Sequence, residues 1–388
     1  MVKFEDNAIH ILNSRGGKEF SIYSHEIQML ADFFEHTSYR QQEQLLKLKG
    51  TKKYSKRQRD SLWIYIDDRK KISKGKKKLP LEGYRIAIDP GHFATSLNDA
   101  LIEQKYLHFL LDSINFPGDT IKVFESELTF TTATLLQKML EAQGASVMLT
   151  RKQSNFTSFE CTYTEWLFLH KKRVLDSLKA KDPASAEKYN KLQKADDYRF
   201  FWDFFRDYDL LNRGIKINRF NPHATAIIHY NVDEKNIPWK KPTDKNFTMA
   251  FIGGAFTADN LETLGAKLHF LRLLLTKQLN QSEKLSAQTV QNFNKNLKVA
   301  IASQTDASYL KDNCLITSSK GVFARNLMLC RIINSPVVYG EALYQDCDTE
   351  CKVLMKKDAE KFGIKTNERL LKAAASYYQA LYDFLKSL

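Results

Sequence analysis

The chain has 388 residues, of which 43% are hydrophobic and 12% aromatic, so it can form one large domain or two ordinary ones and global disorder is excluded. No uninterrupted run of about 18 apolar residues occurs, so we expect no transmembrane helix. The first residues do not show the pattern of an export signal, which predicts either a cytoplasmic protein or a mature form whose signal has been removed. Five scattered cysteines do not form a disulfide framework, although Cys347 and Cys351 are close enough to pair or to remain two free thiols.

The formal net charge of +14 is concentrated in one segment. Residues 47–78 contain fourteen basic residues and three acidic ones, an excess of eleven positive charges. Such a segment attracts polyanions, which include nucleic acid, an anionic membrane surface and an acidic cell-wall polymer. A solvated linker is the alternative interpretation. No nucleic-acid motif accompanies the charge, so no specific nucleic acid is predicted.

Residues 1–80 are predicted to form a basic N-terminal extension or a small accessory unit. Apolar residues between Ile22 and Phe34 have helical spacing, and the alternation of apolar residues in 61–66 predicts a strand. A lysine-rich stretch with glycine and proline then predicts a linker. The main domain is expected to occupy residues 81–388.

Within 81–388, short apolar runs alternate with amphipathic helical patterns. A strand, a helix and a second strand in this order are typical of a parallel crossover unit. The predicted fold is therefore α/β, with a mostly parallel twisted sheet, helices on both faces, large helical insertions and an N-terminal extension. The predicted strands are 86–88, 145–150, 224–229, 247–252 and 336–341, and the predicted helices are 128–140, 261–279 and 366–388.

Two long segments interrupt this pattern. Residues 152–212 are polar and aromatic with helical character, and we interpret the aromatic cluster near their end as core or interface rather than a base-stacking platform. Residues 280–318 are polar, and their structure is not predicted. The stretch from 93 to about 122 is expected to be irregular. Because compact domains rarely carry such long additions without a use, we expect one of the two insertions to restrict access to the functional edge of the sheet.

Three predicted strands end in a possible ligand or acid, namely His92, His229 and Glu341. The carboxyl ends of parallel strands share one edge of a sheet, so these side chains can converge although they are far apart in the sequence. Two imidazoles and one carboxylate form the ligand set of a catalytic zinc, with a fourth position left for water.

The carboxylate ligand is expected where the helix that follows the first histidine begins. Glu125 and Glu127 are the candidates at this helix start, and Glu103 is an alternative if the preceding loop folds back. Asp89 is interpreted as a turn-capping residue rather than a catalytic one. The remaining histidines have no such context and are not assigned.

Five short motifs follow one another in residues 84–388. They are Ile88-Asp89-Pro90-Gly91-His92, Leu149-Thr150-Arg151, Ile228-His229-Tyr230-Asn231, Gly321-Val322 and Pro336-Val337-Val338-Tyr339-Gly340-Glu341. In this order they resemble the zinc-dependent N-acetylmuramoyl-L-alanine amidases of the type 3 family. The resemblance implies one Zn²⁺ per chain, held by His92, Glu125 and His229, because Glu125 has the family's spacing to the Leu-Thr-Arg motif. It also implies that Glu341 is the general base and then the general acid.

The resemblance further implies a peptidoglycan hydrolase that cuts the amide bond between N-acetylmuramic acid and L-alanine of the stem peptide. Such an enzyme acts in the periplasm or elsewhere outside the cytoplasmic membrane, and an activator protein is a candidate partner. Asn231 would orient the substrate or a ligand, or have a structural role. In some members of the family a helix inserted between the second histidine and the final glutamate blocks the metal, which favours 280–318 as the covering insertion.

The sequence also departs from the family pattern. Phe93-Ala94-Thr95-Ser96 replaces the glycines that usually follow the first histidine, and the stretch from His92 to Glu125 is longer than usual. These changes lie around the metal and bear on substrate preference, while residues 1–80 have no counterpart in the family. Two alternatives remain, a zinc amidase or peptidase for another substrate and a non-catalytic cell-wall-binding scaffold with the amidase fold.

Overall fold

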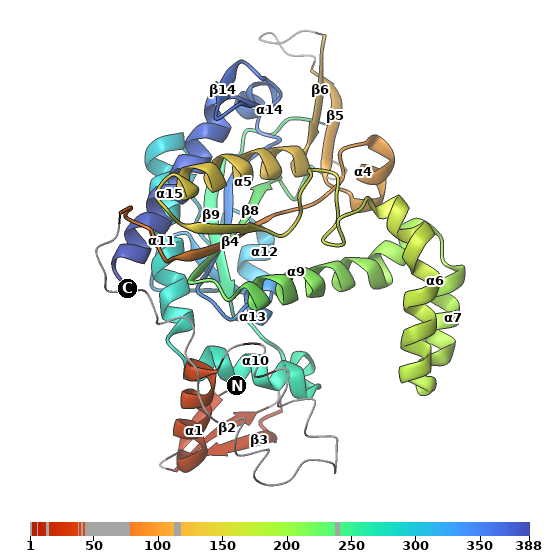
Figure 1. Cartoon of the computed structure of the whole chain (residues 1–388), viewed down its shortest axis with the longest axis vertical. Coiled ribbons are helices and arrows are strands. Elements are labelled where there is room, and N and C mark those ends of the chain that lie inside the picture. The colour runs from red at the N-terminus through yellow and green to blue at the C-terminus, as the bar shows by residue number, and fades with distance from the viewer. Residues whose placement is uncertain are drawn as a thin grey trace.

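The computed structural model describes residues 2–5, 7–12, 15–37, 39, 42, 78–111, 118–236 and 241–388 (Figure 1). The strand predicted for 61–66, and all of the basic segment 47–78 except Lys78, lie outside the described residues.

An eight-stranded sheet forms the centre of the molecule, with the strand order β11-β12-β9-β13-β8-β4-β7 and with β10 paired to β9. Strands β7, β4, β8 and β13 are parallel, β13 meets β9 in antiparallel fashion, and β10 and β12 are parallel to β9. The fold is therefore α/β with a mostly parallel sheet, as the sequence predicts. The strands are β4 (Arg85–Pro90), β7 (Ser146–Leu149), β8 (Ala224–Asn231), β9 (Phe247–Gly253), β10 (Ala300–Ile301), β11 (Cys314–Ile316), β12 (Val322–Arg325) and β13 (Val337–Tyr344).

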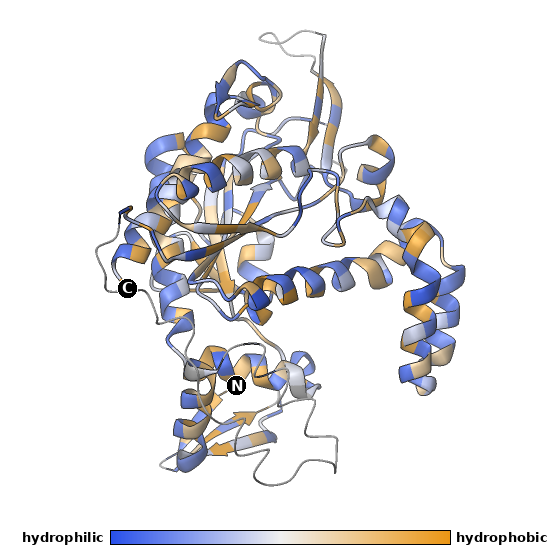
Figure 2. Ribbon diagram, in the orientation of Figure 1, coloured by the Kyte–Doolittle hydropathy of each residue, from blue (hydrophilic) through white to orange (hydrophobic). Residues whose placement is uncertain are grey.

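Helices cover both faces of the sheet, and the alternation of side chains along the strands decides which face each residue contacts. Ile86, Ile228 and Val338 point toward three long helices, whereas Ile227 and Val337 point to the opposite face. The three long helices are α5 (Glu125–Glu141), α11 (Gln278–Leu297) and α15 (Glu368–Lys386). The opposite face is covered by α9 (Arg206–Phe220), α12 (Ser308–Asp312) and α13 (Met328–Ile332). Figure 2 shows that the central strands are largely apolar, as expected for strands buried on both faces, and that the helices are mixed, as expected for helices buried on one face.

Residues 152–212 form a helical insertion, as predicted. Its α6 (Tyr163–Lys181) and α7 (Ala186–Lys194) pack against each other and project from the body of the molecule (Figure 1). Then follow α8 (Asp197–Phe200), a π-helical turn (Phe201–Phe205) and α9. Phe200, Phe201 and Phe205 form a core with Tyr163 and Trp166, which agrees with the interpretation of the aromatic cluster as core.

Residues 280–318 contain most of α11, which the sequence did not predict. Its buried Leu285, Val290 and Phe293 pack on the same side of the sheet as α5 and α15. The helix predicted for 261–279 is interrupted, because α10 (Leu264–Leu275) ends before α11 begins.

Within 93–122, the described residues 93–111 and 118–122 are not irregular. They form α4 (Leu97–Glu103) and a hairpin of β5 (Tyr106–Leu111) and β6 (Asp119–Phe124). Ser96 caps α4 by accepting a hydrogen bond from the Asp99 amide, and this short capped helix has too few turns to show a clear period. The chain closes with α14 (Asp348–Leu354), a hairpin of β14 (Ala359–Lys361) and β15 (Ile364–Thr366), and α15.

The N-terminal residues form a three-stranded antiparallel sheet and a helix. These are β1 (Val2–Glu5), β2 (Ala8–Leu12), β3 (Lys18–Tyr23) and α1 (Ser24–His36). Ile9 and Ile11 contact Leu261, and Phe34 packs with Leu271 of α10, so this unit is docked on the main body (Figure 1). In the described part of the chain, no helix combines the length and apolarity that a membrane span requires. All five cysteines are free thiols, so Cys347 and Cys351 are not joined.

A close approach between β13 and α15 gives a test of this packing. A Cβ at Gly340 would lie 2.2 Å from Tyr377 Oη, and this buried hydroxyl donates a hydrogen bond to the Gly340 carbonyl at 3.0 Å. We expect Gly340→Ala to lower the free energy of unfolding by about 1–3 kcal/mol through overpacking. In urea unfolding, Gly340→Ala/Tyr377→Phe should be more stable than the sum of the two single changes predicts. Strict additivity would contradict the contact.

Candidate metal centre and active site

The turn that follows β4 is held by side chains from three elements. Arg151 donates from Nε to the Pro90 carbonyl (3.3 Å) and from Nη2 to the Gly91 carbonyl (3.0 Å). The Thr129 hydroxyl of α5 donates to the Gly91 carbonyl at 2.6 Å, and Arg213 of α9 donates to the Pro90 carbonyl at 3.2 Å. Both arginines are buried, so the turn is fixed from inside the protein.

Asp89 belongs to this support and not to the reacting groups. Its buried carboxylate accepts a hydrogen bond from the Thr150 hydroxyl and lies 3.5 Å from Arg213 Nη1. Although burial opposes the charged form, Asp209 and Asp89 raise the pKa of Arg213, whereas burial and the charge of Arg213 lower the pKa of Arg151 to about 9. Asp89 is a structural residue, as interpreted, but it ties β4 to α9 and to residue 150 rather than capping the turn.

The turn brings two histidines and one glutamate together. His92 Nε2 lies 3.4 Å and His229 Nδ1 lies 3.0 Å from Glu125 Oε1, and one donor atom from each of the three residues lies within 4.8 Å of the other two. Glu125 is the first residue of α5, so its carboxylate points to the sheet edge from the helix start. The structure thus brings together all three residues that the sequence proposes as ligands.

The backbone of the turn allows the two histidines and the glutamate to approach one another. His92 has φ 57°, a left-handed conformation that residues other than glycine rarely adopt and that is typical of functional sites. A Cβ at Gly91 would lie between 2.3 and 2.7 Å from three atoms of the His229 ring. Only glycine at position 91 therefore leaves room for the second histidine.

Further polar groups orient the three residues. Glu103 Oε1 lies 2.9 Å from His92 Nδ1, and Glu103 Oε2 accepts the amide hydrogens of Phe93 (3.1 Å) and Ala94 (2.9 Å). Gln345 Nε2 donates to Glu125 Oε2 at 3.0 Å. Glu103, considered from the sequence as an alternative ligand, instead contacts the far side of the His92 ring, as carboxylates that orient metal-binding histidines do.

The charges of the site depend on one another. Although burial opposes the charged form, Glu125 and Glu103 raise the pKa of His92 to about 9. Burial also opposes ionisation of Glu125, but the positive charge on His92 lowers its pKa well below the ordinary value. Burial lowers the pKa of His229. A protonated His92 would therefore provide the positive charge that a metal ion provides when it binds here. This proton must leave His92 before the imidazole can bind a metal ion.

Glu341 completes the constellation. It lies directly beside His229 in the register of β13 and β8, and Tyr339 stacks on the His229 ring at 4.5 Å. Glu341 Oε2 is buried and has no hydrogen-bond partner in the described part of the chain. Burial, and then the charge of Glu125, raise the pKa of Glu341 to about 8. A carboxyl group with an unoccupied oxygen and a pKa near neutrality is suited to accept and return a proton.

These residues line a cavity of about 570 Å³. The insertion 152–212 supplies part of its wall through Phe201, Trp202 and Arg206, and Tyr309 of α12 is the contribution of 280–318. The long helix of 280–318, α11, packs on the face of the sheet away from Glu341, so α12 is the part of this segment that reaches the cavity. That an insertion restricts access remains a prediction.

Asn231 also lines the cavity, at the end of β8. Its Nδ2 donates to the Tyr309 hydroxyl at 2.8 Å, and its Oδ1 accepts the Val232 amide hydrogen at 2.9 Å. The side chain is therefore fixed against α12. No signal in the sequence pointed to Tyr309, because this residue does not lie next to a strand end that carries a motif.

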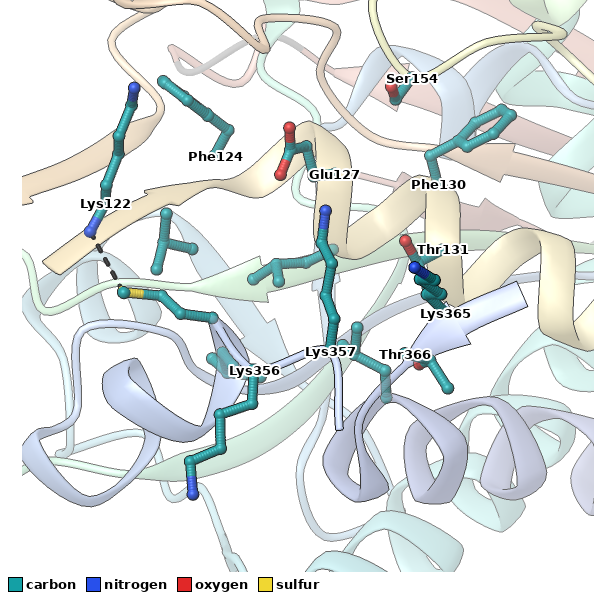
Figure 3. Close-up of a pocket in the computed structure, with 15 residues that line it drawn as sticks. Lys122, Phe124, Glu127, Phe130, Thr131, Ser154, Lys356, Lys357, Lys365 and Thr366 are labelled. Atoms are coloured by element: carbon teal, nitrogen blue, oxygen red, sulfur yellow. Dashed lines mark hydrogen bonds between the residues drawn. The ribbon is translucent and has the colours of Figure 1, made fainter. Parts of the chain in front are cut away.

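A second hollow, of about 270 Å³, lies on the outer side of the α5 start (Figure 3). It contains Glu127, so this residue faces away from the two histidines and is not a ligand. The hollow also contains four lysines, but in Figure 3 Lys122 extends toward the top of the view and Lys356 toward the bottom. The four positive charges thus do not converge on one point.

We expect Gly91→Ala to weaken metal binding by at least about tenfold, because the added Cβ would displace the His229 ring. Zinc content and competition with a chromophoric chelator would measure the loss. Gly265→Ala is the matched control, since nothing lies within 4 Å of a Cβ at that position. Metal affinity equal to wild type in Gly91→Ala would contradict the proposed position of His229.

Glu103→Gln should lower metal affinity about 10–100-fold, the usual effect of removing an outer carboxylate partner of a ligand histidine. Glu262→Gln, which replaces an exposed glutamate, is the control. If Glu103 had only a structural role, thermal stability would fall in Glu103→Gln while zinc affinity stayed unchanged, and that outcome would contradict the orienting role.

Comparisons with known proteins were made against families, curated proteins and solved structures. The comparison with curated proteins finds no match. The amidase CwlD from Clostridioides difficile, in a structure with the GerS lipoprotein, is 14% identical, with 79% of this chain and 100% of that chain covered and a TM-score of 0.42. Ami1 from Mycobacterium smegmatis is 11% identical, with 79% of this chain and 99% of that chain covered and a TM-score of 0.41. At these values the structural likenesses carry no argument.

The family comparison is decisive. The sequence profile of the N-acetylmuramoyl-L-alanine amidase family, Amidase_3, matches residues 86–367. The matched range includes the whole central sheet apart from Arg85, the first residue of β4. It also includes the four residues His92, Glu125, His229 and Glu341. The chain belongs to the N-acetylmuramoyl-L-alanine amidase family.

Proposed function

We propose that the chain is a zinc-dependent peptidoglycan hydrolase that cuts the amide bond between N-acetylmuramic acid and L-alanine of the stem peptide. The observation that carries this proposal is the register of β13 and β8, which sets Glu341, with its buried oxygen that has no partner among the described residues, beside His229, one of three residues whose donor atoms converge. Membership of the amidase family supports the choice of bond.

The donor set fits zinc. Two imidazole nitrogens and one carboxylate oxygen converge, and no cysteine belongs to this group in the described part of the chain. Such a set is typical of catalytic zinc sites, which leave one position open. One zinc ion per chain, bound by His92, Glu125 and His229, would supply Lewis acidity toward the scissile carbonyl and toward water.

Side chains of the protein would transfer the protons. Glu341 would take the proton of the attacking water on its unpartnered oxygen and return it to the leaving amine of L-alanine. Glu103 would hold the His92 ring through Nδ1, so that Nε2 faces the cavity. Asn231, which also lines the cavity and is fixed by Tyr309, is proposed to orient the substrate.

The proposal extends to location and partners. Peptidoglycan lies outside the cytoplasmic membrane, so we propose a periplasmic or otherwise extracytoplasmic protein. Residues 81–388 would form the catalytic domain, and residues 1–80 an accessory unit whose basic segment 47–78 contacts a polyanionic wall polymer or a membrane surface. An activator protein is a further proposed partner. The complete set of four site residues argues against a non-catalytic scaffold.

We expect Glu341→Gln to retain one zinc per chain and to lose about 10²–10⁴-fold in turnover, the usual contribution of a general acid–base group. The measurement is the release of peptides with a new N-terminal L-alanine from purified peptidoglycan, with Glu360→Gln on the exposed β14 hairpin as the control. Release of peptides with another N-terminal residue would indicate a peptidase for a different bond. A zinc-loaded wild type that releases nothing would contradict the proposal.

A further inference from the structure

Arg325 lies in the same cavity as Glu341 and has no role in the proposed chemistry. It ends β12, the strand that begins at Val322 of the Gly321-Val322 motif. Its guanidinium carbon lies 5.3 Å from the centroid of the Phe251 ring and 5.0 Å from that of Tyr309. Two aromatic faces thus hold the cation in place without neutralising it.

The other cavity arginines already have carboxylate partners. Arg206 Nε lies 3.0 Å from Asp207 Oδ1, and Arg213 Nε lies 2.7 Å from Asp209 Oδ2. For Arg325, no carboxylate of the described chain lies within ion-pair distance. It forms no ion pair with Glu341 either, although its charge opposes the rise in the pKa of Glu341. A half-buried guanidinium with aromatic neighbours and no acid is ready to bind an anion.

The position of Arg325 fits the far end of a peptide whose scissile bond lies at the metal centre. Phe251 lies 6.0 Å from the Tyr339 ring, which in turn stacks on His229 at 4.5 Å. Three contacts therefore separate Arg325 from His229, and of the two rings between them Tyr339 lines the cavity whereas Phe251 is buried. An extended peptide advances about 3.3–3.6 Å per residue, so a few residues span this path.

We propose that Arg325 binds a carboxylate of the stem peptide and makes the enzyme prefer peptides with free carboxylates over amidated ones. The inference rests on the proposed function, since it takes the stem peptide as the occupant of the cavity. A guanidinium binds a carboxylate through two parallel hydrogen bonds. A carboxamide has only one acceptor oxygen and no charge, so it would leave a cavity cation without its partner.

The test uses the zinc-loaded full chain carrying Glu341→Gln, so that bound ligand is not consumed. The two probes are N-acetylmuramoyl-L-alanyl-γ-D-glutamyl-L-lysine and the same compound with its carboxyl groups converted to carboxamides. Calorimetric titration should show about tenfold or more tighter binding of the carboxylate form. Adding Arg325→Met should make the two affinities equal, and Arg325→Lys should retain part of the difference.

Lys320→Met is the matched control, because it removes one positive charge from an exposed residue that does not line the cavity. It should keep the full preference. Equal affinity for both probes before any change at Arg325, or an undiminished preference in Arg325→Met, would overturn the inference.

Kinetics with peptidoglycan separate this inference from the proposed function. In the protein with Glu341 intact, Arg325→Met should raise KM for non-amidated peptidoglycan with little change in kcat, because Arg325 does not contact the scissile bond. Peptide release by wild type without a preference in binding would refute the carboxylate site and leave the amidase function standing. A preference lost in Arg325→Met, in a protein that releases no peptide, would support the carboxylate site and refute the amidase function.

Discussion

Two backbone carbonyl groups, those of Pro90 and Gly91, accept hydrogen bonds from the side chains of Arg151, Thr129 and Arg213. These donors come from the end of β7, from α5 and from α9, so the sharp turn after β4 is the place where three parts of the fold are joined. The turn sets the backbone of the first histidine in its left-handed conformation and places a glycine against the second. The positions of both histidines therefore depend on this turn being fixed.

The second constraint is electrostatic. Buried carboxylates surround the first histidine, and a buried carboxylate is stable only when a cation accompanies it. A positive charge on His92 would have this role: Glu125 and Glu103 raise the pKa of His92, and a charged His92 lowers the pKa of Glu125. Glu341 lies on the neighbouring strand, and the described residues give it no ion-pair partner. Burial, and then the charge of Glu125, therefore move its pKa in the opposite direction. The two glutamates thus differ in environment, which supports the proposed division between a metal ligand, Glu125, and a proton carrier, Glu341.

Much of this arrangement was predictable from the sequence, because it depends on local patterns. The apolar period of α5 and the buried runs of β4, β8 and β13 indicate elements whose ends carry the site residues. What could not be predicted depends on tertiary contacts. The sequence offers Glu103 as an alternative ligand, but its contact with the far side of the His92 ring depends on α4, which folds back over the turn. Helix α11 is a core helix despite its polar composition, since its four buried apolar residues, Leu285, Val290, Phe293 and Leu297, suffice to bury one side. Arg325 has no motif of its own, and its environment comes from rings on two other elements.

The central claim is that two imidazoles and one carboxylate of this chain hold a single metal ion. X-ray absorption at the zinc edge of the zinc-loaded protein tests it most directly. The claim predicts a first shell of nitrogen and oxygen at about 2.0–2.2 Å with the outer-shell signal of two imidazoles, and His92→Ala should remove one imidazole. Sulfur at about 2.3 Å, or a spectrum without imidazole, would contradict it, because the five free cysteines would then be the alternative ligands.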